Sequence, residues 1–404
     1  MNDLLAQTNM RELVVAVSIT QADLGFELGS WGAIEYLLER LNPERCNHLK
    51  VVSLSHLRKP TGLSFLPGAL ANANLERLQL HVESGIEQTS WPNIKHLTVV
   101  QPLGAGLSQL QELVLWGFDL DKAERNVPQL FNLTTLRVLM LIDCTNMDQL
   151  LLWLSERPIH SRAIREIAIE NLDNVERSID PGSVSAWIAS CKKLAVLQLD
   201  ISCFQGEAID DLIEAILESK ETLEALRLGL SRDPWAHPDP GGNSNTNNLD
   251  LLSFPPYALN GLYAFPKLQE LSLCLDMSAR DLGGLYRILP PNLLVLDITI
   301  RNREAAGFPE LASAVTDLVE NTGFLKVVVV RQTALWRSSS GMVWARCFLV
   351  DETNRITVVN GSIDDAFVPG VGKLGELRMN IHACLEFPVR TTLERYTKGV
   401  GAGC

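Results

Sequence analysis

The chain has 404 residues, of which 46% are hydrophobic, and it carries a formal net charge of −13 with a pI of about 5.1. This length and hydrophobic content are sufficient for a large core, so disorder over most of the chain is excluded. Nucleic-acid binding is disfavoured, because a surface that follows phosphates needs an excess of basic side chains.

The distribution of cysteines and apolar residues indicates an intracellular protein. The eight cysteines are scattered singly, without a C-x-x-C pair, which is typical of reduced thiols. The first ten residues carry no secretory signal, and no window approaches the roughly 20 apolar residues of a membrane span. We therefore expect no membrane association and a cytoplasmic location, with the nucleus as the alternative.

One six-residue phrase, L-x-x-L-x-L, recurs along nearly the whole chain. It is clearest at Leu110–Leu115 and again at Leu136–Leu141. Several neighbouring copies are separated by about 26 to 30 residues, close to the period of long leucine-rich repeats. The copies begin at Met10, Leu49, Leu75, Ile94, Leu110, Leu136, Ile164, Leu194, Leu223, Leu268, Leu293, Leu325 and Leu374.

Segments with helical spacing of apolar residues lie between these phrases, at 33–41, 147–154, 184–191, 207–217, 282–289 and 311–319. Ser183 is predicted to cap the third of them. Each phrase predicts a short strand that places its first, fourth and sixth residues in the core. Repeated strand and helix therefore predict an α/β solenoid with a parallel sheet on one side and helices on the other.

The pattern resembles the leucine-rich repeat family, in particular the degenerate repeats of fungal F-box/leucine-rich-repeat proteins, from about Met10 to Val330 and more weakly over 374–381. The resemblance implies a curved, ribonuclease-inhibitor-like solenoid with the sheet on its concave face. Two features depart from the family. The Asn or Cys ladder is largely missing, although Cys144 and Cys203 lie near its position, and no F-box precedes the first repeat. A ubiquitin-ligase adaptor is therefore disfavoured.

We predict two regions, a repeat solenoid over 1–332 and a C-terminal capping region over 333–404. Val343–Val350 and Arg355–Val359 alternate as the two strands of a β-hairpin would, and a last repeat-like strand follows. The cap would protect the end of the sheet, and a lid or a dimer contact is the alternative. A Pro/Gly/Asn-rich insertion at 231–250 predicts a long loop.

Catalytic signatures are scarce, so catalytic residues stay unknown and we predict no metal and no cofactor. The histidines are not placed at metal-ligand spacing, and no P-loop, H-E-x-x-H or G-x-S-x-G motif is present. Gly370–Gly375 fits G-x-G-x-x-G, but Pro369 precedes it and a predicted strand follows, whereas a dinucleotide fingerprint opens a helix.

Strand alternation places the third, fifth and seventh residues of each phrase on the concave face. This face is expected to carry an apolar patch with a polar rim. Something must cover the patch, either a partner or ligand, or a part of the chain such as the 231–250 insertion or the hairpin. The predicted patch is Val100, Val114, Trp116, Val138, Met140 and Ile142, and the rim is His96, Glu170, Asp200 and Arg227.

Two functional hypotheses follow. The first is a binding protein that recognises a protein, a peptide or an apolar small molecule through the concave face, as the resemblance implies. The alternative is an enzyme of secondary metabolism, a cofactor-independent cyclase or pericyclase that holds an apolar substrate in a dry pocket.

Overall fold

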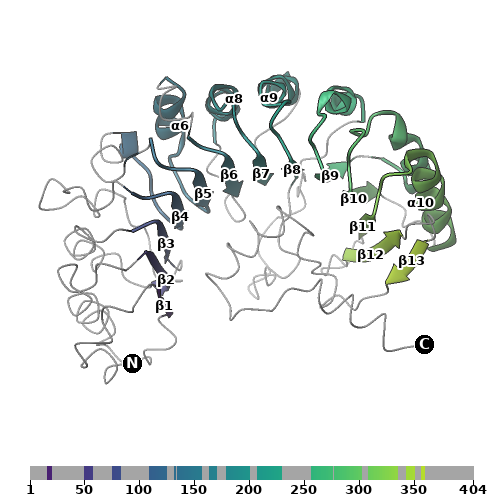
Figure 1. The fold of residues 1–404 in the computed structure, drawn as a ribbon, viewed down its shortest axis with the longest axis horizontal. Coiled ribbons are helices and arrows are strands. Elements are labelled where there is room, and N and C mark those ends of the chain that lie inside the picture. Colours follow the sequence, from purple (N-terminus) through teal and green to yellow (C-terminus); the bar gives the residue numbers. More distant parts are fainter. Residues whose placement is uncertain are drawn as a thin grey trace, which may run out of the picture. The chain divides into compact units, whose positions relative to one another are not determined.

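The computed structural model describes residues 16–20, 50–57, 75–82, 109–124, 132, 134–156, 163–170, 179–200, 207–229, 256–275, 277–302, 308–334, 343–350 and 356–359 (Figure 1). The chain forms two compact units. Of the described residues, the first unit holds those up to Ala168 together with Ala186–Lys193, and the second holds Ile169–Ser185 and those from Leu194 onward. This division differs from the predicted one at residue 332, and the predicted capping region stays a prediction.

The first unit contains five parallel strands that pair with one another in chain order. The leucines of neighbouring phrases lie side by side, with Leu113 opposite Leu139 and Leu115 opposite Leu141, and all four are buried. The predicted parallel pairing of these strands is confirmed. The elements are β1 (Ala16–Thr20), β2 (Val51–Leu57), β3 (Arg77–Val82), β4 (Glu112–Trp116), β5 (Val138–Ile142) and the helix α6 (Asp148–Ser155).

Two elements, β6 (Glu166–Glu170) and α8 (Pro181–Ser190), have residues in both units. The helix α8 begins at Pro181, where the missing N–H of proline is harmless. The carboxylate of Asp180 accepts a 2.9 Å hydrogen bond from the backbone N–H of Ser183, three residues later. Asp180 is therefore the N-cap, and the prediction that Ser183 caps this helix was wrong. The Ser183 hydroxyl donates instead to the carbonyl of Asp180, at 2.8 Å.

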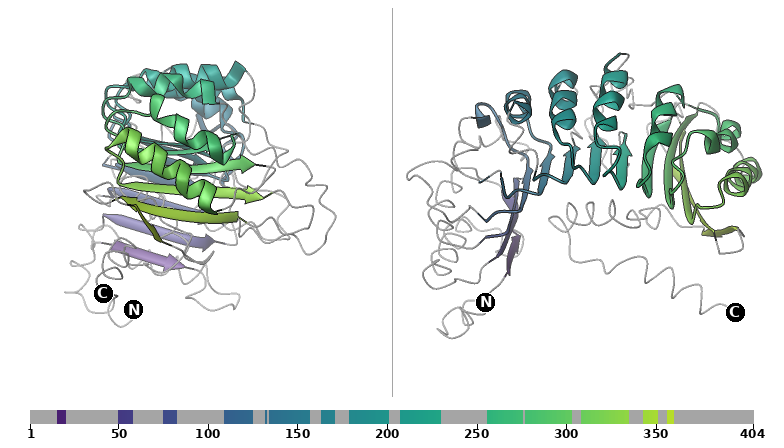
Figure 2. Two further views of the ribbon diagram at one scale, coloured as in Figure 1. Left: turned by 90° about the vertical axis from the view of Figure 1, so that its right-hand side faces the viewer. Right: turned by 45° about the horizontal axis from the view of Figure 1, so that its top comes forward.

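The second unit continues the same pattern of parallel strands, with Leu226, Leu271 and Leu296 in register and buried. Its helices lie on one face of the strands, where α9 contacts η5 and η6 contacts α10 (Figure 2). The elements are β7 (Val196–Asp200), α9 (Glu207–Leu217), β8 (Ala225–Leu228), η5 (Pro256–Ala264), β9 (Glu270–Leu275), η6 (Ala279–Arg287), β10 (Val295–Asn302), α10 (Phe308–Thr322) and β11 (Val327–Ala334).

The predicted helix at 207–217 coincides with α9, whereas the predicted helix at 282–289 is formed as the 3₁₀ helix η6. The predicted hairpin is confirmed, because β12 (Val343–Val350) and β13 (Ile356–Val359) pair antiparallel, and β12 also pairs antiparallel with β11. The fold is thus α/β with a parallel sheet, as predicted. Among the described helices, none is both apolar enough and long enough for a bilayer crossing.

Candidate functional site

Side chains of β3, β4 and β5 form three rows on the face of the first unit opposite the buried leucines. We call this surface the first-unit strand face. In each row the residues are direct partners across neighbouring strands. The rows are Arg77, Glu112 and Val138; Gln79, Val114 and Met140; and His81, Trp116 and Ile142.

Three of the residues predicted to form an exposed apolar patch are buried. Val114 is 1% exposed, and Met140 and Ile142 are both 0% exposed. The chain by itself therefore buries these three side chains, which is one of the two kinds of cover that the sequence left open. Trp116 and Val138 remain partly exposed. The 231–250 insertion, predicted as one possible cover, lies outside the described residues, as do His96 and Val100.

The first row carries a buried carboxylate that binds two partners. One oxygen of Glu112 lies 2.6 Å from Nε of Arg77, and the other accepts a 3.1 Å hydrogen bond from the amide of Gln79. The Glu112 side chain is 8% exposed, whereas that of Arg77 is 39% exposed. A buried charge needs such compensation, so these contacts explain how a carboxylate is accommodated here.

Trp116 is held on two sides. Its ring packs against His81, with the ring centroids 4.3 Å apart and the planes tilted by 35°. Its indole N–H donates a 3.1 Å hydrogen bond to Oδ2 of Asp143, the residue that follows β5. Asp143 has a φ of 47°, in the left-handed region that Asp and Asn tolerate better than most residues. These contacts fix the orientation of an indole that is still partly exposed.

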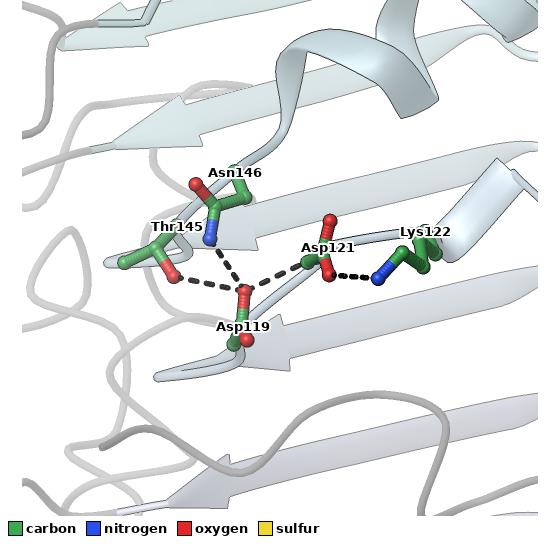
Figure 3. Close-up of polar contacts among 5 residues, drawn as sticks. All are labelled: Asp119, Asp121, Lys122, Thr145 and Asn146. Carbon is green, nitrogen blue, oxygen red and sulfur yellow. Dashed lines mark hydrogen bonds and ion pairs between the residues drawn. The ribbon is translucent and has the colours of Figure 1, made fainter.

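The loops that follow β4 and β5 are joined by one aspartate (Figure 3). Oδ1 of Asp119 accepts hydrogen bonds from the backbone N–H of Asp121 at 3.0 Å, the amide of Asn146 at 2.7 Å and the hydroxyl of Thr145 at 3.4 Å. Lys122 forms an ion pair with Asp121 at 3.1 Å. Asp119 thus stabilises both loops, and they position Asp143 beside Trp116.

Cys144 lies where the ladder of the repeat pattern is expected. Its thiol donates to the carbonyl of Leu115 on the neighbouring strand, with Sγ and O 3.4 Å apart. Burial raises the pKa of this thiol to about 12, so it is protonated at neutral pH and is unsuited to act as a nucleophile. Cys203, the other residue predicted near this position, lies outside the described residues.

Of the predicted polar rim, Glu170, Asp200 and Arg227 lie in the second unit, whereas the Trp116 group lies in the first. Glu170 and Arg227 are both buried, and Glu170 accepts a hydrogen bond from the amide of Gln198. Gln198 and Arg227 are partners across β7 and β8. Asp200 is the last residue of β7. The structure therefore brings Val114, Trp116, Val138, Met140 and Ile142 together, and separately groups Glu170 with Arg227 through Gln198.

Sequence reasoning missed His81, Asp143 and Gln198 as members of these groups. Strand register was a signal for His81 and Gln198, because the aligned phrases place His81 beside Trp116 and Gln198 beside Arg227. No simple pattern identifies Asp143. It is a loop residue with a positive φ, and its carboxylate accepts the hydrogen bond of the Trp116 indole.

Within the described ranges, no group of three or more His, Cys, Asp or Glu side chains is arranged to hold a metal ion. Comparison with known proteins gives no relative, since neither a protein-family model nor a curated protein matches the chain.

Proposed function

We propose that this protein is a curved leucine-rich-repeat solenoid that binds a protein or peptide through its strand face, with Trp116 at the centre of the contact. The repeat assignment is supported by leucines that stay in register across β3, β4 and β5 and by the Cys144 thiol that bonds the neighbouring strand. A solenoid of this kind can contact an extended partner through the exposed parts of its strand surface.

The single observation that carries the proposal is the geometry of Trp116. Its ring is fixed by His81 and by the bond to Asp143, yet part of the indole is exposed. Tryptophan is enriched among the residues that dominate binding energy, because it supplies a large contact area. A tryptophan that is already fixed loses little further conformational entropy on binding. Trp116 therefore has the properties of a binding anchor.

The buried part of the face has a different role. Val114, Met140 and Ile142 are buried in the chain by itself, and Ile142 is the direct partner of Trp116 on the neighbouring strand. Val138 and Arg77 are partly exposed on the same face, in the row two steps along the strands from that of Trp116. The contact surface that we propose therefore consists of Trp116, Val138 and Arg77.

The proposal is tested by selecting binders from a displayed library of random peptides and comparing the wild-type chain with Trp116→Ala. The matched control is Tyr263→Ala, because Tyr263 is an aromatic residue on η5 with 64% exposure and belongs to no part of the proposed surface. We expect peptides selected on the wild type to bind the Tyr263 variant equally well and to lose at least about tenfold in affinity for the Trp116 variant.

Thermal melting of both variants accompanies the binding measurement. Retained affinity in a folded Trp116→Ala variant would overturn the proposal, and so would a loss of affinity confined to Tyr263→Ala.

A further inference from the structure

We infer that the first unit binds an acidic peptide segment of a partner along one edge of its sheet, through the cations Arg137, Arg165 and Lys193. We call these three residues the basic edge. All three belong to the first unit and are exposed. They lie where strands begin, whereas Trp116 is the last residue of β4. The inference therefore goes beyond the proposed function and does not depend on it.

The three cations lie at the starts of neighbouring strands. Arg137 and Arg165 immediately precede β5 and β6, and the backbone N–H of Arg165 donates to the carbonyl of Arg137 at 2.8 Å. Lys193 lies in the turn between α8 and β7, and β7 is the neighbour of β6 in the sheet. Neighbouring strands are about 4.8 Å apart, so one extended peptide can contact all three side chains.

The same edge shows how a cation at this position is compensated elsewhere. Lys50 and Glu76 immediately precede β2 and β3, and the N–H of Glu76 donates to the carbonyl of Lys50 at 2.8 Å, as in the arginine pair. Nζ of Lys50 forms an ion pair with Glu76 at 2.7 Å. Before β5 and β6 both positions hold arginine, and like charges on neighbouring strands repel each other. A carboxylate from a partner would relieve this repulsion.

The basic edge has no carboxylate partner within the part of the chain that the structure describes. None of the ion pairs there includes Arg137, Arg165 or Lys193, although Glu166 follows Arg165 directly. The segments that lead into β5 and β6, at 125–136 and 157–164, contain no Asp or Glu. Lys192 is also exposed here, but it has a further interaction, so the basic edge is defined by the other three residues.

A peptide fits this edge better than a larger polyanion. The whole chain has a net charge of −13, so a nucleic-acid duplex or an anionic bilayer, which covers a wide surface, would also face carboxylates. An extended peptide contacts the edge alone. At about 0.1 M salt the Debye length is about 10 Å, so the local cations outweigh negative charges farther away. Arginine suits this role, because its guanidinium can bind a carboxylate through two parallel hydrogen bonds.

The central variant for the test is the double substitution Arg137→Gln with Arg165→Gln. The matched control is Lys267→Gln with Lys326→Gln, which removes the same charge from two exposed lysines that precede β9 and β11 in the second unit. Lys326 immediately precedes its strand, as Arg137 does. A third variant, Arg165→Glu, places a carboxylate beside Arg137 and reproduces the compensated pair found before β2 and β3.

The probe is a fluorescein-labelled peptide of alternating glutamate and glycine, and its counterpart has lysine in place of glutamate. Fluorescence anisotropy with the full chain at about 0.1 M salt measures both. We expect the glutamate peptide to bind the wild type saturably, the lysine control within about twofold of the wild type, and the arginine double variant about fivefold or more weakly. Arg165→Glu should bind as weakly as the double variant, with an unchanged or higher urea midpoint, because the new carboxylate pairs with Arg137.

Absence of binding between the glutamate peptide and the wild type would overturn the inference. Equal losses in the two double variants would also overturn it, because they would indicate attraction by total charge only. Wild-type affinity in Arg165→Glu, or equal binding of the glutamate and lysine peptides, would contradict it as well. Tighter binding of a DNA duplex or of phosphatidylserine vesicles than of the glutamate peptide would overturn the assignment to a peptide.

Discussion

Replacing Met140 with alanine tests whether the strand face of the first unit is covered in the free protein. Met140 is 0% exposed, the same as Leu141, its neighbour on the opposite face of β5. Truncating a fully buried methionine or leucine to alanine costs about 2 to 5 kcal/mol, because apolar contacts are lost and a cavity remains. Met140→Ala and Leu141→Ala are therefore expected to destabilise the protein by similar amounts.

Urea unfolding followed by circular dichroism measures both variants against the wild type. With a denaturant slope of about 1 to 3 kcal/mol per molar urea, a loss of this size lowers the midpoint by roughly 1 M or more. A surface residue would cost only about 0.5 kcal/mol or less. A loss below that value for Met140→Ala, alongside a large loss for Leu141→Ala, would refute the reasoning, since it would mean that the face is open to water in solution.

Three further predictions concern single contacts. Iodoacetamide should label Cys144 and Cys191 only after unfolding, as measured by mass spectrometry. Burial raises the pKa of each thiol to about 12, so only about one thiol in ten thousand is a thiolate at pH 8. Rapid labelling of the native protein would contradict this prediction. Asp180→Ala should cost about 0.5 to 2 kcal/mol in urea unfolding through loss of the α8 cap, and an unchanged midpoint would exclude that role. Gly229→Ala should cost about 1 to 3 kcal/mol by the same measurement, because the added Cβ would lie 3.2 Å from Cβ of Cys274, and a neutral result would show that β9 shifts freely.

The strands and their partners could be predicted from the sequence because the repeated leucines encode both the period of the strand and the register. One phrase aligned on the next places Leu113 beside Leu139, and the structure has this pair. The helix at 207–217 and the hairpin at the end were predictable for the same reason, since each depends on local periodicity.

The burial of the opposite face could not be predicted in this way. Alternation says that Met140 and Leu141 point to opposite faces, but it does not say what covers either face. The phrase therefore leaves open whether a partner or the chain itself covers the face. The prediction of Ser183 as a cap failed because the sequence does not fix the first residue of the helix. Asp180 and Ser183 are both good capping residues, and the start of the helix at Pro181 decides between them.

The binding group around Trp116 was predictable in part. The pattern placed Trp116 on the strand face, and register could have added His81. Asp143 required the backbone, because its positive φ turns the chain so that its carboxylate meets the indole N–H. Loop conformations of this kind depend on contacts such as those of Asp119 with Asn146, which join two different loops.

The most direct test of the central claim is an NMR titration of the protein labelled with ¹⁵N only in tryptophan. The chain has eight tryptophans, and the indole signal of Trp116 is assigned by its disappearance in Trp116→Phe. On addition of a peptide from the display selection, we predict a saturable shift of the Trp116 signal and an unchanged signal for Trp187, which is 0% exposed in α8. Saturable binding that leaves the Trp116 signal unchanged would contradict the account.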